Sequence, residues 1–293
     1  MSIPRRDRSA FFPGDLKTLL HELGHAIHRF ARGVRPLAQA FDFVETPSIL
    51  LEKWGSIPEV LRELSCHYSY ITPGDHSRWR QTQKHPTALR PPQKIGRSLM
   101  KRTCAQMRYD VVHGLQTTLW RAMYDFKIHT STPDELEHMD LAKEWNMMRY
   151  MVTRIIGPTT IVRRGSREVI SHGSGHIQFA ADYPNYNAGY YCYLLGMVIS
   201  QDIFDTKFRF DPLKPKQFRR YREIVLENSD DLSVAETLEN FLGRPVSEKA
   251  YFEALESASR DMYGSPLTGF EKIRRNFRDA LKLVKAVSIA NKD

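Results

Sequence analysis

A stripe of apolar residues near the amino terminus limits the fold of this chain more than any other feature. Its members recur at steps of three and four residues: Leu16, Leu19, Leu20, Leu23 and Ile27. This spacing is typical of an amphipathic helix. We predict a helix through residues 21–28 with this face semi-buried, starting near Pro13-Gly14-Asp15 with Asp15 as its cap.

The same helical spacing recurs along the chain, and runs of alternating β-branched residues are few. We predict a mainly α fold with further helices over residues 115–126, after the capping box of Thr132 and Glu135, over 190–204, over 234–241, and after a last capping box of Thr268 and Glu271. Residues 161–170 and the glycine-rich segment that follows are predicted to be a loop between two helices.

Composition indicates a folded protein of ordinary core size, since the chain has 293 residues and 41% hydrophobic content. No window approaches the roughly 18 apolar residues of a membrane span, and the first 20 residues lack the apolar stretch of a signal peptide. We therefore expect no membrane partner.

The cysteines and the first residues bear on the compartment. Cys66, Cys104 and Cys192 are far apart and odd in number, which favours reduced thiols in a cytosol-like compartment. We expect a cytoplasmic protein. Arginines at positions 5, 6 and 8 make a mitochondrial location the weaker alternative.

Most of the net charge of +9 comes from one segment, about residues 76–109, which contains nine Lys and Arg residues and no acidic residue. Because it also contains three prolines, we interpret it as a solvated loop or insertion. A basic binding module is the alternative, and salt-dependent retention of nucleic acid would reveal it. We do not expect a nucleic acid partner.

The motif His21-Glu22-Leu23-Gly24-His25 matches the H-E-x-x-H pattern. On a helix this spacing puts both imidazoles on one face, where they can share a zinc ion. Glu22 would lie beside the metal and take a proton from a zinc-bound water. Two histidines four residues apart by chance are the alternative interpretation.

A third ligand must come from outside this helix. His28 shares the stripe, but three ligands from one straight helix span too long an axial distance for one tetrahedral ion. Glu45, beside a predicted helix start at Pro47, and Glu52 are both candidates. Without further information either could be a solvated glutamate.

The segment from Thr18 to His28 resembles the zinc helix of the thimet oligopeptidase and mitochondrial intermediate peptidase family. Residues 42–48 are similar to the family segment that provides the glutamate ligand, so the resemblance selects Glu45 over Glu52. Further similar stretches follow in family order at residues 125–130, 221–226 and 241–245. The resemblance covers about residues 16–255 and implies one Zn²⁺ per chain, held by His21, His25 and Glu45, with Glu22 as the general base.

The resemblance also extends to Gly175-His176 and to the tyrosine-rich segment 186–194. In the family the matching histidine and tyrosines line the cleft opposite the metal and bind the substrate backbone. It implies that His176, Tyr186, Tyr190 and Tyr193 bind substrate, with His176 and Tyr193 also catalytic. A neutral donor held at the carbonyl oxygen suits that chemistry. The alternative is an aromatic helix packed in the core.

The implied fold is a helical, zincin-like catalytic lobe, and the implied function is hydrolysis of peptide bonds in short peptides by a zinc-dependent endopeptidase. The domains would be a leader at 1–15, the catalytic domain at 16–260 and a helical extension at 261–293. In family members most of the sequence precedes the zinc helix. The alternative is therefore a truncated, inactive remnant that keeps the metal site.

Overall fold

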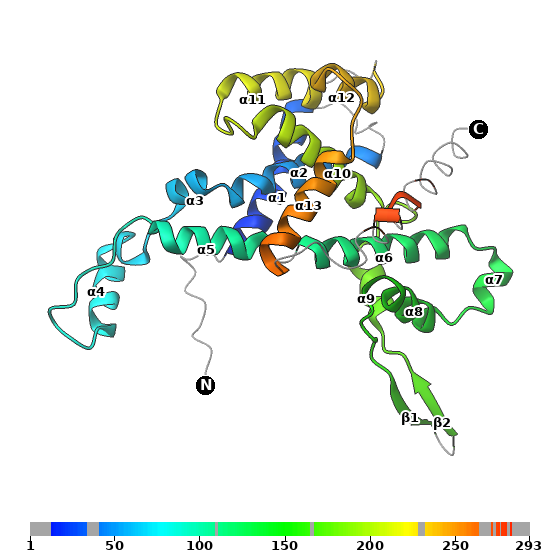
Figure 1. Cartoon of the computed structure of the whole chain (residues 1–293). Coiled ribbons are helices and arrows are strands. Elements are labelled where there is room, and N and C mark those ends of the chain that lie inside the picture. Colours follow the sequence, from blue (N-terminus) through cyan, green and yellow to red (C-terminus); the bar gives the residue numbers. More distant parts are fainter. Residues whose placement is uncertain are drawn as a thin grey trace.

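The computed structural model describes residues 13–33, 41–108, 111–164, 167–227 and 232–263, and several positions between 271 and 282. The described part is mainly α, as predicted (Figure 1). In chain order its α-helices are α1 (Pro13–Arg32), α2 (Thr46–Glu52), α3 (Pro58–Leu64), α4 (Pro73–Thr82), α5 (Arg97–Arg108), α6 (Val111–Thr130), α7 (Pro133–Glu137), α8 (Leu141–Thr153), α9 (Gly175–Asp182), α10 (Cys192–Ile203), α11 (Pro215–Tyr221), α12 (Val234–Leu242) and α13 (Lys249–Tyr263).

Shorter turns connect these helices. The 3₁₀ turns are η1 (Phe41–Phe43), η2 (Lys53–Ser56) and η3 (Tyr68–Tyr70). Two π-helical turns, η4 (Phe204–Phe208) and η5 (Arg222–Leu226), continue α10 and α11.

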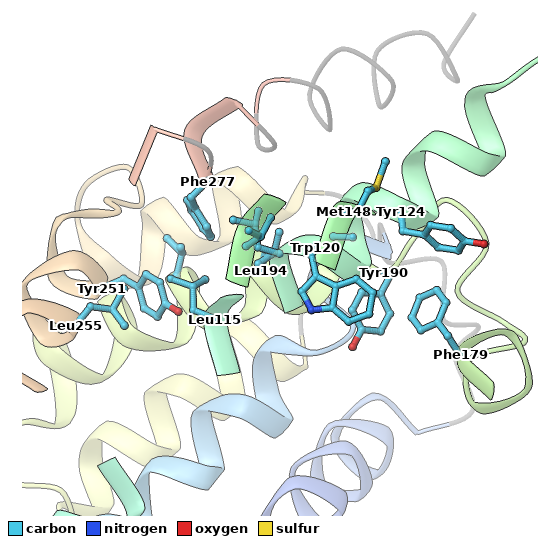
Figure 2. Packing of buried hydrophobic residues seen from close by; sticks show 14 of the residues in the cluster. Leu115, Trp120, Tyr124, Met148, Phe179, Tyr190, Leu194, Tyr251, Leu255 and Phe277 are labelled. Carbon is cyan, nitrogen blue, oxygen red and sulfur yellow. The ribbon is translucent and has the colours of Figure 1, made fainter. Parts of the chain in front are cut away.

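Helix α10 lies at the centre of the molecule because its faces belong to two hydrophobic cores. Leu194 and Val198 join the first core, which is formed with α6, α8, α9 and α13 (Figure 2). Ile199 and Ile203 join the second core, with α2, α11 and α12. Helix α10 also packs directly against α2, so the second core fixes the position of α2 relative to α10.

The predicted helices lie where their patterns placed them. The segments 115–126, 190–204 and 234–241 correspond to α6, α10 and α12. The capping box of Thr132 and Glu135 is present in both directions at the start of α7. Thr268 lies outside the described residues, but Phe277 is buried in the first core.

Two details of the predicted zinc helix need correction. Asp15 lies inside the first turn of α1, which already begins at Pro13. The face of Leu19, Leu23 and Ile27 is exposed, at 47%, 45% and 41%, instead of semi-buried. The contact with α2 is made on the side of Gly24, so the histidine side of the helix is the one that packs.

The segment predicted as a loop over residues 161–170 is a β-hairpin. Strands β1 (Thr160–Arg164) and β2 (Arg167–Ser171) pair antiparallel, with Ile161 opposite Ile170. The β-branched residues of this segment favour extended backbone, and a Gly-Ser pair between two such runs is typical of a β-hairpin. The loop prediction gave too much weight to the glycines that follow the segment. The hairpin projects away from the helices in Figure 1.

The basic segment is also more ordered than predicted. Residues 76–109 include most of α4 and all of α5, joined by an extended connection. Some of its charges have structural roles: Arg80 donates to the carbonyls of Pro86 and Ala88, and Arg90 lies over the ring of Tyr70. The interpretation as a loop is therefore wrong, and the interpretation as an insertion stays a prediction.

The predictions about the cysteines and about membrane spans can be compared with the structure. The three cysteines are free, with Cys66 exposed and Cys104 and Cys192 buried. Among the described helices, none has the length and apolar character needed to span a membrane. The domain boundaries at 15 and 260 stay predictions, although Pro13 to Asp15 already belong to α1.

Candidate metal centre

The close approach of α1 to α2 depends on Gly24. A Cβ atom added there would lie 2.5 Å from Cα of Ser48 and 2.7 Å from the carbonyl oxygen of Pro47. Real Cβ atoms do not approach backbone so closely, so only glycine permits this crossing. Since His21 and His25 flank Gly24 on the same helix, the crossing carries both imidazoles to the start of α2.

Glu45 is the residue directly before α2. Its backbone carbonyl accepts the N–H of Ile49 at 3.1 Å and the hydroxyl of Ser48 at 2.8 Å. Pro47 in the first turn fits the helix start, where its missing N–H costs nothing. The Glu45 side chain is fully buried and points at α1.

Three donor atoms form a nearly equilateral triangle. Nε2 of His21 and Nε2 of His25 are 3.3 Å apart, and Oε2 of Glu45 lies 3.3 Å from the first and 3.4 Å from the second. Tetrahedral zinc with bonds of about 2.0–2.1 Å requires ligand atoms about 3.3 Å apart. The residues present therefore fit a zinc ion, with a fourth position left for water, and they are the three predicted ligands.

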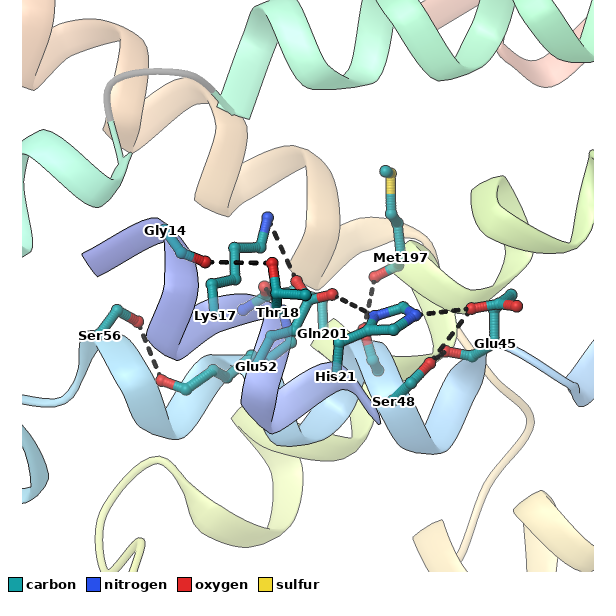
Figure 3. Close-up of polar contacts among 12 residues, drawn as sticks. Gly14, Lys17, Thr18, His21, Glu45, Ser48, Glu52, Ser56, Met197 and Gln201 are labelled. Atoms are coloured by element: carbon teal, nitrogen blue, oxygen red, sulfur yellow. Dashed lines mark hydrogen bonds and ion pairs between the residues drawn. The ribbon is translucent and has the colours of Figure 1, made fainter. Parts of the chain in front are cut away.

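Glu52 completes the surroundings of His21 from the opposite side (Figure 3). Its Oε1 lies 2.6 Å from Nδ1 of His21, and Lys17 lies 3.2 Å from its other oxygen. A hydrogen bond at Nδ1 fixes the tautomer that leaves Nε2 free for a metal. The two glutamates that the sequence left as alternatives thus contact the same imidazole, one at each nitrogen.

The two acids also control the charge of the centre. Burial alone would lower the pKa of His21, but the hydrogen bonds to Glu45 and Glu52 outweigh it and raise the pKa to about 9. Burial alone would raise the pKa of Glu45, but the hydrogen bonds from His21, His25 and Tyr186 hold it well below its usual value. Glu45 is therefore an anion at neutral pH, as a metal ligand must be.

Glu22 lies on α1 directly after His21, and its side chain is exposed. A carboxylate in this place can exchange protons with water near the metal position. Its role as general base stays a prediction.

Tyr186 contacts the metal centre directly. Its hydroxyl donates to Oε1 of Glu45 at 2.6 Å, and its ring stacks on Tyr193 with 5.5 Å between centroids. Burial and the Glu45 contact raise the pKa of Tyr186. Burial also raises that of Tyr193, together with the Glu45 charge. Both phenols are therefore neutral at physiological pH. Tyr186 donates its one proton to Glu45, and a neutral phenol such as Tyr193 is the kind of donor that stabilising an oxyanion requires.

The other two predicted residues lie on α9 and in the segment before α10. Tyr190 is only 4% exposed, packs edge-on against Phe179, and accepts a hydrogen bond of 3.4 Å from Arg121. His176 lies at the start of α9, with its Nδ1 buried and without a hydrogen-bond partner in the part of the chain that is described. Substrate contacts for His176 and Tyr190, and the catalytic role of His176, stay predictions.

An open cleft of about 1290 Å³ leads to the centre. Its lining includes His21, Glu52, Tyr193 and Met197, together with Tyr251 from α13. A volume of this size admits a peptide segment. The cleft thus runs from His21 at the metal position to Tyr193 on α10.

Sequence reasoning missed three contributors to the site: Gly24 as the contact point of the helices, Glu52 as the partner of Nδ1, and Asp125 as an acceptor for the tyrosine segment. The seven-residue spacing of Glu45 and Glu52 placed both on one side of a short helix and made Glu52 a candidate ligand, but it did not indicate the contact with Nδ1. The other two depend on contacts between distant segments.

Comparison with known proteins identifies the family. A model described as "Peptidase family M3" matches residues 2–257. The chain belongs to peptidase family M3. This agrees with the resemblance to the thimet oligopeptidase and mitochondrial intermediate peptidase group, because curated members of that group are among its M3 relatives.

Three relatives illustrate the range of similarity. Saccharolysin of Saccharomyces cerevisiae is 30% identical over 250 residues, which are 82% of this chain and 30% of that protein. Oligopeptidase PhomG of Diaporthe leptostromiformis is 27% identical over 249 residues, 83% of this chain and 34% of that protein. Mitochondrial intermediate peptidase of Homo sapiens is 22% identical over 265 residues, 88% and 32% of the two chains. The M3 chain thus matches about a third of the length of these relatives.

Proposed function

We propose that this M3 chain binds one zinc ion through His21, His25 and Glu45 and acts as a metalloendopeptidase on short peptides. The observation that supports the proposal most is the triangle of donor atoms with sides of 3.3–3.4 Å. The relatives named oligopeptidase or intermediate peptidase support the substrate class.

Zinc, when bound, lowers the pKa of a coordinated water to about 7 and polarises the scissile carbonyl. Glu22 takes the proton of the attacking water and transfers it to the leaving amine. The hydroxyl of Tyr193 donates a hydrogen bond to the carbonyl oxygen as negative charge develops there. His176 and Tyr190 bind the substrate backbone. Tyr186 also binds the substrate and donates a hydrogen bond to the Glu45 ligand.

The test combines zinc analysis with hydrolysis of a quenched fluorescent peptide by the parent and by Glu22→Gln. We expect about one zinc per chain in both proteins and a loss of hydrolysis of roughly 100-fold or more in Glu22→Gln, because an amide cannot accept the proton. His21→Ala and Glu45→Ala should both lose zinc. Retention of zinc by both would contradict the ligand assignment.

The second candidate is an inactive remnant that keeps the metal site and does not hydrolyse peptides. Stoichiometric zinc in a folded parent without Glu22-dependent hydrolysis would favour the remnant. Zinc-free parent protein would contradict both candidates.

A further inference from the structure

The buried carboxylate of Asp125 holds the backbone of the segment that carries Tyr186. Residues 183–191, the tyrosine loop, connect α9 to α10. Asp125 on α6 is 2% exposed and accepts two backbone N–H groups of this loop, from Ala188 at 3.1 Å and from Tyr190 at 3.0 Å. Each backbone N–H has its own carboxylate oxygen, so the carboxylate holds three consecutive residues, and Nδ1 of His129 on the same helix lies 3.0 Å from Oδ1.

The clamped backbone has a conformation that the chain would otherwise avoid. Ala188 has a φ of +54°, in the left-handed region where a side chain is disfavoured. Such conformations persist when surrounding contacts determine them. The two bonds from Asp125 flank this position and supply such contacts.

Neighbouring contacts make the loop a rigid connector. Gly189 lies against the ring of Phe41, where an added Cβ would be 2.3 Å from a ring carbon. The hydroxyl of Tyr191 donates to Asp42. Both partners belong to η1, directly before Glu45, so the loop is fixed at α6 on one side and at the ligand segment on the other.

The loop reaches the metal position through one side chain. Tyr186 donates to Oε1 of Glu45 at 2.6 Å, while Oε2 faces the two histidines. The hydroxyl of Ser48 lies 3.2 Å from Oε2, so Tyr186 and Ser48 hold the carboxylate together, one at each oxygen. Displacement of the loop would remove the hydrogen bond at Oε1 and weaken the control of the carboxylate's orientation.

We propose that Asp125 is a positioning residue: by holding Ala188 and Tyr190 it sets Tyr186, and through Tyr186 the orientation of the Glu45 ligand. The proposal rests on the proposed function where it concerns zinc affinity. The part that concerns the loop does not depend on a metal.

The first experiment compares Asp125→Asn with Asp75→Asn. Asp75 is a matched control because it is 3% exposed, hydrogen-bonded to Thr72 at 2.6 Å, and located on α4. An asparagine offers one acceptor oxygen where aspartate has two. In Asp125→Asn, amide hydrogen exchange of Ala188 or Tyr190 should accelerate at least tenfold, and zinc affinity by chelator competition should fall about 10- to 100-fold. Asp75→Asn should change neither.

A rescue distinguishes positioning from general damage to the core. Glycine adopts positive φ without penalty, so Ala188→Gly should leave the parent's zinc affinity within about threefold and restore most of the affinity in the Asp125→Asn background. If Asp125→Asn does not fold, Ala188→Val tests the same link, because a β-branched residue at this φ displaces the loop. We expect the same loss of zinc affinity from it.

The outcomes separate this inference from the proposed function. Unchanged amide exchange and unchanged zinc affinity in folded Asp125→Asn would overturn the inference. An equal loss in Asp75→Asn, or no rescue by Ala188→Gly, would also overturn it. A parent that binds no zinc would contradict the proposed function, whereas amide exchange in Asp125→Asn would still decide the loop contact.

Discussion

Glu52 bonds His21 at Nδ1 over 2.6 Å, on the opposite side of the ring from the atom that faces Glu45. This contact orients the ring without using a ligand position, and carboxylate partners of this kind typically matter for metal affinity. The two glutamates therefore have different roles: Glu45 is the predicted metal ligand, and Glu52 orients the imidazole of His21.

Glu52→Ala should weaken zinc binding about 10- to 100-fold without abolishing it, because the ligands remain but the His21 tautomer is no longer fixed. Chelator competition measures the change. Glu59→Ala is the control, since Glu59 lines the same cleft on α3 and is exposed. Complete loss of zinc in Glu52→Ala would instead make Glu52 a ligand.

Zinc affinity should rise with pH. In the metal-free protein the pKa of His21 is raised to about 9, so below that pH zinc must displace a proton from this imidazole. We expect apparent affinity to increase about tenfold per pH unit around neutral pH and to level off as pH passes through 9. Glu52→Gln should move the plateau to lower pH. A flat profile between pH 7 and 9, corrected for the chelator, would contradict the raised pKa.

Gly24→Ala should lower the free energy of unfolding by about 1–3 kcal/mol, because the new methyl group meets backbone of α2 that cannot move aside. Zinc affinity should fall with it, since α1 carries two ligands. Gly14→Ala is the control on the same helix, where an added Cβ meets nothing within 4 Å. Urea denaturation of the metal-free proteins compares the two. Equal stability of both variants would show that the helices do not depend on this contact.

Tyr193→Phe should lower kcat about 100- to 1000-fold, equivalent to about 2.7–4 kcal/mol, with little change in KM, because the phenol acts where charge develops. Tyr190→Phe should affect kcat less, since the Tyr190 side chain is buried and its hydroxyl contacts Arg121. Steady-state kinetics on a quenched fluorescent peptide measures both. A raised KM with unchanged kcat would make Tyr193 a residue of ground-state binding.

How much could be predicted from sequence depended on the range of the interaction. The capping box at Thr132 and the helix over 234–241 follow from hydrogen bonds and periodicity within a few residues, and both were found. The hairpin at 160–171 was missed although its signal was local, because glycines after it were given more weight than the β-branched residues inside it. The exposed face of Leu19 and Leu23 was missed because periodicity shows that a helix has an apolar side without showing what covers it.

The metal centre divides in the same way. The sequence by itself determined that His21 and His25 lie one turn apart on one face, because the helical period places residues four apart side by side. Only the tertiary structure decided that Glu45 meets Nε2 of His21 while Glu52 meets Nδ1, since both depend on how closely Gly24 lets α1 approach α2. It also brought Tyr186 to Glu45 across 141 positions of sequence, through a loop anchored by Asp125. Contacts at that separation follow from the packing of α6 and α10 in a shared core, a property that no local pattern encodes.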